Sequence, residues 1–242
     1  MKCLIIAAGM GSRLRSMAAS KPLAEVAGTP LLAHVVRSAR AAGATSFVVV
    51  TGYEAEGIER FLPRLAETVG APIQSVRNGE WERPNGLSVL AAAELLDGPF
   101  ILLMSDHLFD PAILATLIAG HRAEAALTLS VDEDVANPLL DVDDATKVAL
   151  GPDGRILRIG KTLERYDAVD TGIFIATPAL LAAIREAVAA GGAGSLSEGV
   201  QRLADQGRAF AVPSGGRWWI DVDDEAAHRR AEATLPEALA AA

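Results

Sequence analysis

The loop after the first apolar segment contains residue types that bind phosphate. Its small side chains leave room for backbone N–H groups to approach an anion closely, and they belong to Ala7, Ala8, Gly9, Gly11 and Ser12. Arg13 and Lys21 supply two cations, and Pro22 is expected to hold Lys21 in an extended conformation. The loop is therefore a candidate phosphate cradle.

Two familiar phosphate-binding motifs do not fit this loop. A dinucleotide fingerprint needs a third glycine where the chain has Leu14. A Walker A loop would place Gly-Lys-Ser or Gly-Lys-Thr here, and the loop has neither. A tight strand-to-helix turn without a ligand stays open as the alternative.

Three acids at the ends of apolar segments can bind a divalent cation. Asp106 ends one predicted strand, and Asp221 and Asp223 end another far along the chain. Residues two apart on a strand face the same side, and Mg²⁺ commonly takes one or two carboxylates together with substrate phosphates. Asp106 with one or both of the later acids is a candidate Mg²⁺ site, while helix capping stays open for Asp106 and Asp223. His107 is expected to pack or to form a hydrogen bond.

Polar residues in the middle of the chain add candidate ligand groups. Asp170 and Thr171 interrupt an apolar run with groups suited to hydroxyls, and Gly172 would let a ligand approach the backbone. Asn85-Gly86 is a strong turn signal before a helix, and Ser88 could satisfy first-turn amides. Taken alone, Asn85, Gly86 and Ser88 indicate the start of a helix and no ligand.

The elements that would position these residues alternate in the first half of the chain. Strands are expected at residues 4–7, 47–51, 73–77 and 100–104, and helices at 30–42, 54–67, 87–96 and 111–121. Short apolar strands without alternation indicate a parallel sheet covered by helices on both faces. Ligands bind such sheets at the carboxyl ends of the strands, where the loop and Asp106 are expected to lie.

After about residue 124 the connections between expected strands become shorter. Strands are expected at 126–131, 147–150, 156–159 and 169–175, helices at 178–189 and 196–205, and a terminal helix from near Asp224. A further strand pair, 209–212 with 218–220, is expected around Ser214-Gly215-Gly216. The fold class predicted is α/β, with a doubly wound, Rossmann-like, mostly parallel mixed sheet and a small lobe.

Composition excludes several classes of protein. The 242 residues include 31 acidic and 22 basic side chains, and the net charge of -9 argues against a nucleic-acid-coating protein. The single cysteine, Cys3, excludes an intrachain disulfide and a Cys-based zinc site. Neither a signal peptide nor a membrane segment is expected, so a cytoplasmic location is predicted.

Short motifs follow one another in a specific order. They are Ala-Ala-Gly-x-Gly-Ser-Arg (7–13), Lys-Pro-Leu (21–23), Asn-Gly-Leu-Ser (85–88), Ser-Asp-His (105–107), Ala-Thr-Lys (145–147), Ile-Gly-Lys (159–161), Val-Asp-Thr-Gly (169–172), Leu-Ser-Glu (196–198) and Trp-Ile-Asp-Val-Asp (219–223). The set resembles the sugar-nucleotidyltransferase-like family, and most of all its CTP:inositol-1-phosphate cytidylyltransferases. Members of the family transfer NMP from an NTP to a phosphorylated acceptor. The resemblance covers nearly the whole chain and implies a nucleotidyltransferase, GT-A-like fold.

The resemblance also implies roles for individual residues. Arg13, Lys21 and Lys161 would contact the reacting phosphates, and Asp106, Asp221 and Asp223 would hold Mg²⁺. The nucleotide side would include the loop residues 7–12 with Asp106, and Asn85, Gly86 and Ser88 near the base. The acceptor side is expected to include Lys147, Asp170, Thr171, Gly172 and Glu198, although Leu196-Ser197-Glu198 is also a typical helix cap.

The resulting hypothesis is one nucleotidyltransferase domain over residues 1–242, with a nucleotide-binding half at 1–123 and an acceptor-binding half at 124–242. Its substrates would be CTP and a phosphorylated polyol, most of all inositol 1-phosphate. Some relatives are fused to a membrane synthase, and this chain is expected to be the stand-alone form. A phosphocholine or other phospho-amine acceptor, another NTP with a sugar phosphate, a nucleotide-sensing regulatory protein and a homodimer all stay open.

Overall fold

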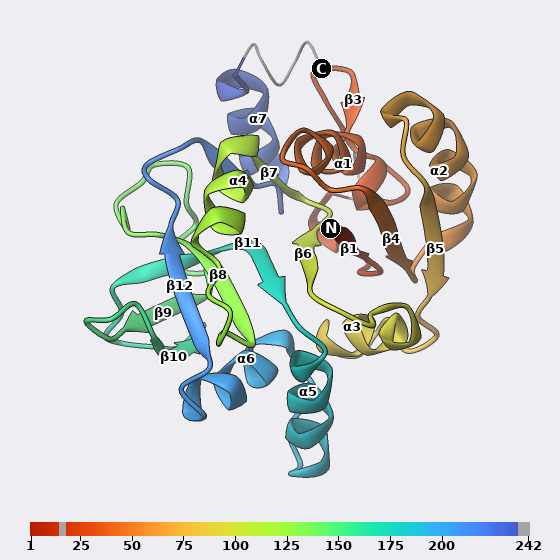
Figure 1. Ribbon diagram of the computed structural model, residues 1–242. Coiled ribbons are helices and arrows are strands. Elements are labelled where there is room, and N and C mark those ends of the chain that lie inside the picture. Colours follow the sequence, from red (N-terminus) through yellow and green to blue (C-terminus); the bar gives the residue numbers. More distant parts are fainter. Residues whose placement is uncertain (15–17, 237–242) are drawn as a thin grey trace.

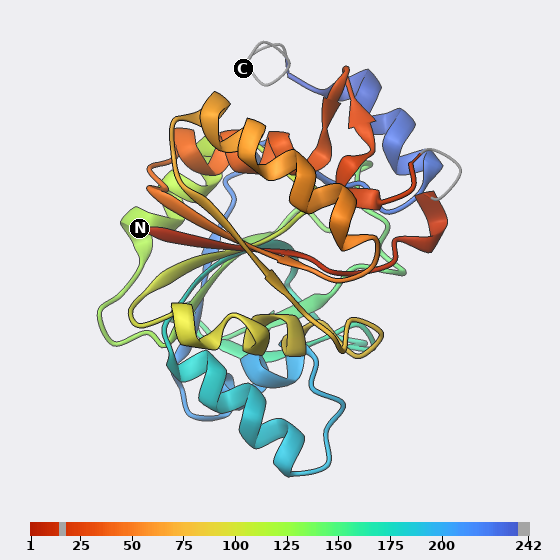
Figure 2. The same cartoon turned by 90° about the vertical axis from the view of Figure 1, so that its right-hand side faces the viewer.

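The computed structural model describes residues 1–14 and 18–236 (Figure 1). A central sheet lies between two layers of helices (Figure 2). In the described residues the sheet has nine strands: β1 (Lys2–Ala7), β4 (Ser46–Thr51), β5 (Ile73–Arg77), β6 (Phe100–Met104), β8 (Leu127–Asp132), β9 (Lys147–Leu150), β10 (Ile156–Gly160), β11 (Ala168–Ala176) and β12 (Ala209–Pro213).

The first half of the sheet is parallel, as the apolar runs predict. β1 lies between β4 and β6, pairs with both in parallel, and β5 continues the parallel set beyond β4. Residues 3–7 of β1 are all buried, because helices cover both faces of these strands. The carboxyl ends of β1 and β6 therefore meet at one edge, directly before the glycine loop and Asp106.

The helices form two layers around this sheet. The helices are α1 (Leu31–Ala41), α2 (Ala55–Val69), α3 (Gly86–Ala91), α4 (Pro111–Gly120), α5 (Ala179–Ala189), α6 (Leu196–Asp205) and α7 (Glu225–Thr234). α1, α2 and α4 contribute to one buried apolar cluster, and α3, α5 and α6 contribute to the other, on the opposite face (Figure 2). α7 packs against β13 (Trp219–Asp221) and β2 (Glu25–Val26), which forms a small hairpin with β3 (Thr29–Pro30).

The second half makes the sheet mixed. β11 runs antiparallel to β6, β8 and β9, and β10 is antiparallel to β9 across a short turn at residues 151–154. The expected pairing of 209–212 with 218–220 is wrong. β12 instead pairs in parallel with β8, while β13 pairs antiparallel with β7 (His107–Phe109) outside the main sheet. The reason is that β7 turns out of the sheet after Asp106 and presents a free edge to β13.

Three local expectations also need correction. Lys21 is not extended, because Lys21–Leu23 forms a 3-10 turn in which Pro22 occupies an early position that needs no N–H donor. The expected helix at 87–96 divides into α3 and a 3-10 turn, Ala93–Leu95. The helix at 111–121 is capped by Asp110, whose carboxylate accepts from the Ala112 N–H, and not by Asp106. None of the helices in the described ranges combines the length and the apolarity that crossing a membrane requires.

Candidate active site

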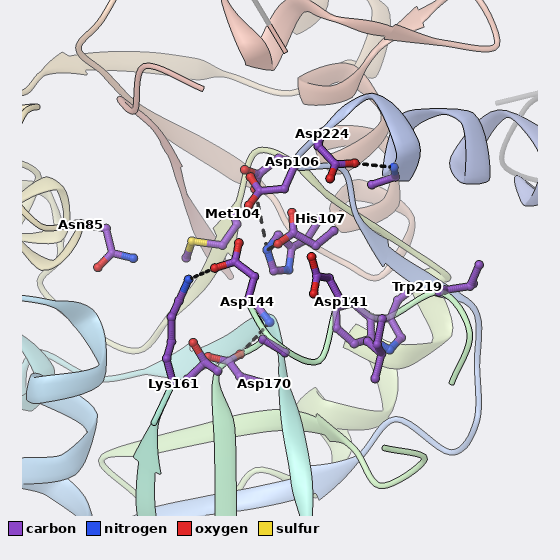
Figure 3. Close-up of a pocket in the computed structure, with 18 of the residues that line it drawn as sticks. Asn85, Met104, Asp106, His107, Asp141, Asp144, Lys161, Asp170, Trp219 and Asp224 are labelled. Atoms are coloured by element: carbon purple, nitrogen blue, oxygen red, sulfur yellow. Dashed lines mark hydrogen bonds and ion pairs between the residues drawn. The ribbon is translucent and has the colours of Figure 1, made fainter. Parts of the chain in front are cut away.

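Two cavities adjoin at the carboxyl ends of β1 and β6. The loop cavity, about 350 Å³, is lined by the glycine loop, Lys21 and the segment before α3. The lobe cavity, about 260 Å³, is lined largely by the second half of the chain (Figure 3). Both cavities are lined by one common set of residues: Arg13, Asn85, Met104, Asp106 and Asp223. One guanidinium and two carboxylates thus belong to this shared wall, where a ligand in one cavity would meet a ligand in the other.

Lys21 lies against the acids of this wall, on the side of the loop cavity, because Gly11 makes room for it. Gly11 has φ +58°, and a Cβ there would overlap the Lys21 side chain. The buried Lys21 ammonium pairs with Asp106 at 2.5 Å and also with Asp223. Burial alone would lower the pKa of Lys21, but the carboxylates of Asp106, Asp221 and Asp223 outweigh it and raise that pKa. Lys21 is therefore a fixed positive charge.

Most of the predicted phosphate-loop residues line the loop cavity. These are Ala7, Gly9, Gly11, Ser12 and Arg13, with Asn85 and Ser88 across from them. Ala8 is buried behind the loop, where its carbonyl accepts from the Tyr53 N–H. Gly86 packs against the backbone of Gly194 and Ser195, which a Cβ would strike. Helix packing therefore requires glycine at position 86, and the predicted contact of Gly86 with the base stays a prediction.

The acids Asp106 and Asp221 converge with His107 beside the shared wall. One ligand atom of each residue lies within 4.8 Å of the others. The Asp221 Oδ1 is buried and has no hydrogen-bond partner in the part of the chain that the structure describes. Such an unpartnered carboxylate oxygen, next to a second carboxylate, suits a hard divalent cation such as Mg²⁺. Asp223 lines the same wall, and it is free to do so because Asp224 caps α7.

His107 is held against the acids by a close backbone contact. Its Nδ1 lies 2.8 Å from the Thr171 carbonyl, and its Nε2 lies 3.4 Å from Asp221. Gly172, with φ +75°, permits this approach because a Cβ would overlap the imidazole. Burial would lower the pKa of His107, but Asp221 and Asp106 outweigh it and raise the pKa to about 10. Against the opposing effect of burial, the charged imidazole in turn lowers the pKa of Asp221.

The lobe cavity is closed on one side by the strap, our name for residues 133–146 between β8 and β9. Asp132 anchors its start: one carboxylate oxygen accepts from the Trp219 Nε1 at 2.8 Å and from the Asn137 amide at 3.0 Å. Near its end, the Asp144 carboxylate accepts from Arg13 at 2.7 Å and also pairs with Lys161 (Figure 3). The strap therefore connects the glycine loop to the lobe.

Of the residues predicted for the acceptor side, Lys161, Asp170 and Gly172 line the lobe cavity. Asp170 accepts from the Gly172 N–H at 2.7 Å, and burial raises the pKa of Asp170 to about 6. Lys147 lies behind this surface, where its ammonium donates to the Lys161 carbonyl and lies 5.8 Å from the Tyr166 ring centroid. Lys147 can thus position the segment that carries Lys161.

Two other acceptor-side predictions need correction. The Thr171 side chain is fully buried and its hydroxyl donates to the Ser130 carbonyl, because alternate residues of β11 face opposite sides of the sheet. Glu198 completes a capping box with Ser195 and accepts from the backbone N–H groups of Ala193, Gly194 and Ser195. Its carboxylate is therefore committed to the start of α6, which is the helix-cap alternative.

Several residues of the two cavities were not predicted. Trp81 and Arg83 line the loop cavity, and Asp141 and Asp144 line the lobe cavity. Trp81 and Arg83 follow a strand of the parallel set, β5, so their position at its carboxyl end was a usable signal. No sequence signal pointed to the acids of the strap, because a charged segment between strands is typical of a solvent-exposed loop.

Comparisons with known proteins agree with this architecture. A curated relative from Rubrobacter xylanophilus, "Bifunctional IPC transferase and DIPP synthase", is 37% identical over 90% of this chain and 48% of its own length. The chain thus spans about half the length of that relative. The "CMP-5'-(3-aminopropyl)phosphonate synthase" of Streptomyces rubellomurinus is 37% identical over 51% of this chain and 20% of its own length.

A solved structure, the inositol-1-phosphate CTP transferase from T. maritima, superposes with a TM-score of 0.84 at 25% identity, over 99% of this chain and 93% of the other. This likeness confirms the predicted α/β fold class with its mostly parallel mixed sheet. The family model of the MobA-like NTP transferase domain matches residues 3–202, which is most of the chain. The chain belongs to this nucleotidyltransferase family.

Proposed function

We propose that this protein transfers CMP from CTP to inositol 1-phosphate, or to a closely similar phosphorylated polyol, with Mg²⁺ as cofactor. The products would be CDP-inositol and pyrophosphate. One observation carries the proposal: two cavities meet at a wall that contains Arg13, Asp106 and Asp223. A nucleotide in one cavity and an acceptor phosphate in the other would bring their reacting atoms together there. The names of the Rubrobacter relative and the T. maritima structure support the choice of substrates.

The loop cavity suits the nucleotide. Its glycine loop offers backbone N–H groups, while Arg13 and Lys21 supply the positive charge that a triphosphate needs. In the same cavity, Trp81 offers an aromatic surface, and Asn85 and Ser88 offer polar groups. Phosphates would thus lie against the glycine loop, Arg13 and Lys21, and the base against Trp81 and the start of α3.

Asp106, Asp221 and Asp223 would hold Mg²⁺, as the unpartnered Asp221 oxygen suggests. When bound there, the ion would supply positive charge to phosphate oxygens and help to align them. His107 would keep the Asp221 carboxylate oriented and ionised, because it lies opposite Asp221 in the β7–β13 pair with its Nε2 3.4 Å from that carboxylate. Removal of divalent ions with EDTA is expected to stop turnover.

The chain's own residues would act mainly by alignment and charge neutralisation. An oxygen of the acceptor phosphate attacks the α-phosphorus of CTP, and the bond from that phosphorus to the β-phosphate oxygen breaks, so pyrophosphate leaves. The attacking oxygen is already anionic near neutral pH, so the step needs no strong general base. Lys21 and Arg13 would neutralise the leaving pyrophosphate, and Lys161 would orient the acceptor phosphate.

A pyrophosphate-release screen tests the proposal. CTP, UTP, GTP and ATP are each combined with inositol 1-phosphate, phosphocholine and glucose 1-phosphate, with Mg²⁺ present. Release is expected with CTP and inositol 1-phosphate, and it should be abolished by Asp106→Ala with the circular dichroism spectrum unchanged. Near-normal release by that variant would contradict the site. Binding of CTP in a thermal-shift assay without release from any pair would favour the regulatory alternative.

One observation favours a second candidate, a phosphorylated or phosphonylated amine as acceptor. The lobe cavity is lined by the carboxylates Asp141, Asp144 and Asp170, which could hold an ammonium group. The name of the Streptomyces relative describes a product in which CMP is joined to an aminopropylphosphonate. Trp219 lines the cavity and could offer an aromatic face to such an ammonium group, whereas its neighbour Trp218 donates its Nε1 to Thr234 of α7. Adding 3-aminopropylphosphonate to the screen decides between the two acceptor classes.

A further inference from the structure

The strap places a carboxylate between two cations that come from opposite sides of the site. Leu139, Leu140 and Ala145 pack against the core, so the backbone around Asp144 has fixed neighbours. From this position one oxygen of Asp144 accepts from Arg13 at 2.7 Å, and the other pairs with Lys161. Arg13 belongs to the glycine loop and lines both cavities, whereas Lys161 follows β10 and lines the lobe cavity.

These are the two cations to which the proposed function assigns substrate phosphates. A carboxylate offers oxygen acceptors to the same N–H donors that a phosphate would use. Lys161 and then Arg13 hold the pKa of Asp144 well below its usual range, so this acid is ionised at neutral pH. Asp144 therefore fills, with a single negative charge, the place where an anionic ligand would bind.

We propose that Asp144 is an internal counterion that occupies Arg13 and Lys161 in the substrate-free protein and that substrate phosphate must displace. The inference rests on the proposed function in one respect, that these two cations contact substrate phosphates. Asp144 is then a specificity residue. Monoanions that match a carboxylate do not displace it efficiently, whereas phosphate groups with more charge and more acceptor oxygens do.

The geometry suits a group that can be displaced. The Arg13 and Lys161 side chains are 50% and 59% exposed, and ion pairs of such exposure each contribute little to stability. Arg13 also keeps a second partner, Asp223, so its charge is not left alone when Asp144 moves away. By contrast, the buried Lys21 pairs with Asp106 and Asp223, two of the acids proposed to hold Mg²⁺. Among the described residues, it forms no hydrogen bond or ion pair with Asp144.

Calorimetric titration with inorganic pyrophosphate tests the inference without turnover. The full chain is titrated in EDTA as wild type, Asp144→Asn and Asp143→Asn. Asp143→Asn is the matched control, because Asp143 is exposed on the same strap and its substitution removes the same charge one residue away from Asp144. Asp144→Asn is expected to bind pyrophosphate about three- to tenfold more tightly, as loss of competing ion pairs predicts. Asp143→Asn should stay within about twofold of wild type.

Asp144→Glu retains the charge and serves as a second variant, expected to bind like wild type. Equal tightening by the Asn substitutions at 143 and 144 would reduce the effect to general electrostatics and overturn the inference. Weaker binding by Asp144→Asn, or no pyrophosphate binding by any variant, would also overturn it. Failure of the proposed function is a separate result: absence of CTP turnover with every acceptor, while the pyrophosphate affinities still differ as expected.

Discussion

The loop cavity and the lobe cavity share a wall but are built in different ways. The loop cavity is formed by short segments that directly follow the parallel strands β1, β5 and β6. The lobe cavity is formed largely by the strap and by β13, which pairs with β7 outside the main sheet, together with residues of β11 around the positive-φ Gly172. Regular parallel strands thus fix the region proposed for the common substrate, the nucleotide. Irregular segments form the region proposed for the acceptor, which is where members of one family can differ.

Their cations differ in the same sense. Lys21 of the loop cavity is 7% exposed and lies against Asp106 and Asp223, whereas Lys161 of the lobe cavity is 59% exposed. A buried ion pair keeps its geometry, while an exposed one can exchange partners. The comparison predicts that a change at the buried cation of the loop cavity affects the chemical step and that a change at the exposed cation of the lobe cavity affects acceptor binding.

The largest effect is expected from Lys21→Met. Loss of this fixed charge should lower kcat/KM by roughly 10²–10³-fold, the range found when one preorganised electrostatic donor is removed. Steady-state pyrophosphate release with both substrates varied measures the change, and circular dichroism monitors the fold. A decrease that appeared only in the KM for the acceptor would break the comparison between the two cavities.

Lys161→Met is expected to have a smaller and more selective effect. Charge-assisted hydrogen bonds contribute roughly 1.5–3 kcal/mol, so the KM for the acceptor should rise about 10- to 100-fold. The KM for CTP should change by less than about twofold, because the exposed Lys161 lines the lobe cavity and not the loop cavity. The same assay measures both constants, and an equal rise in both would place Lys161 on the nucleotide side.

Trp81→Leu probes the far end of the loop cavity. Stacking of a base on an aromatic side chain contributes roughly 1–3 kcal/mol, so CTP should bind about tenfold more weakly. Affinity for pyrophosphate, which has no base, should stay unchanged. Calorimetry with the two ligands measures this difference, and parallel losses for both would indicate a general disturbance through the Trp81–Tyr53 ring contact.

The smallest effect concerns the stability of the lobe. Glu198→Gln weakens the cap of α6 and should lower the free energy of unfolding by about 1 kcal/mol at pH 7. Burial alone would raise the pKa of Glu198, but the N–H groups of residues 193–195 outweigh this effect and hold the pKa below its usual value near 4.5. The wild-type advantage is therefore full above that value and is lost as pH falls through the lower, folded pKa. Urea unfolding at several pH values measures it, with Glu186→Gln, on the exposed side of α5, as the neutral control.

Sequence patterns predicted the parallel half of the fold and the acids beside it well. The glycine loop and Asp106 are local features, because each directly follows a strand whose apolar residues predict its burial, and Lys21 lies in the connection that the glycine loop begins. The positions of Asp221 and Asp223 were also predicted, since the strand that carries them ends at the same site. The roles of these residues stay predictions until the assays are performed.

The remaining differences come from contacts between distant segments. The partner of β12 is β8, not its neighbour in sequence, and no local pattern specifies that choice. Thr171 and Glu198 have residue types suited to ligands, but long-range packing and helix capping use their polar groups. Asp144 was missed because its partners Arg13 and Lys161 lie 131 and 17 residues away in the sequence, so nothing local marks it as part of the site.

The position of β13 has a consequence for how such a chain can be rearranged in evolution. Residues 1–123 contain the glycine loop, Lys21 and Asp106, but Asp221 and Asp223 arrive only with β13, through its pairing with β7. A gene fusion that replaced everything after residue 123 would remove these acids and leave Lys21 beside a single carboxylate. New acceptor specificities are therefore expected to arise by insertions and substitutions between β8 and β13, within the strap above all, and not by exchange of whole halves.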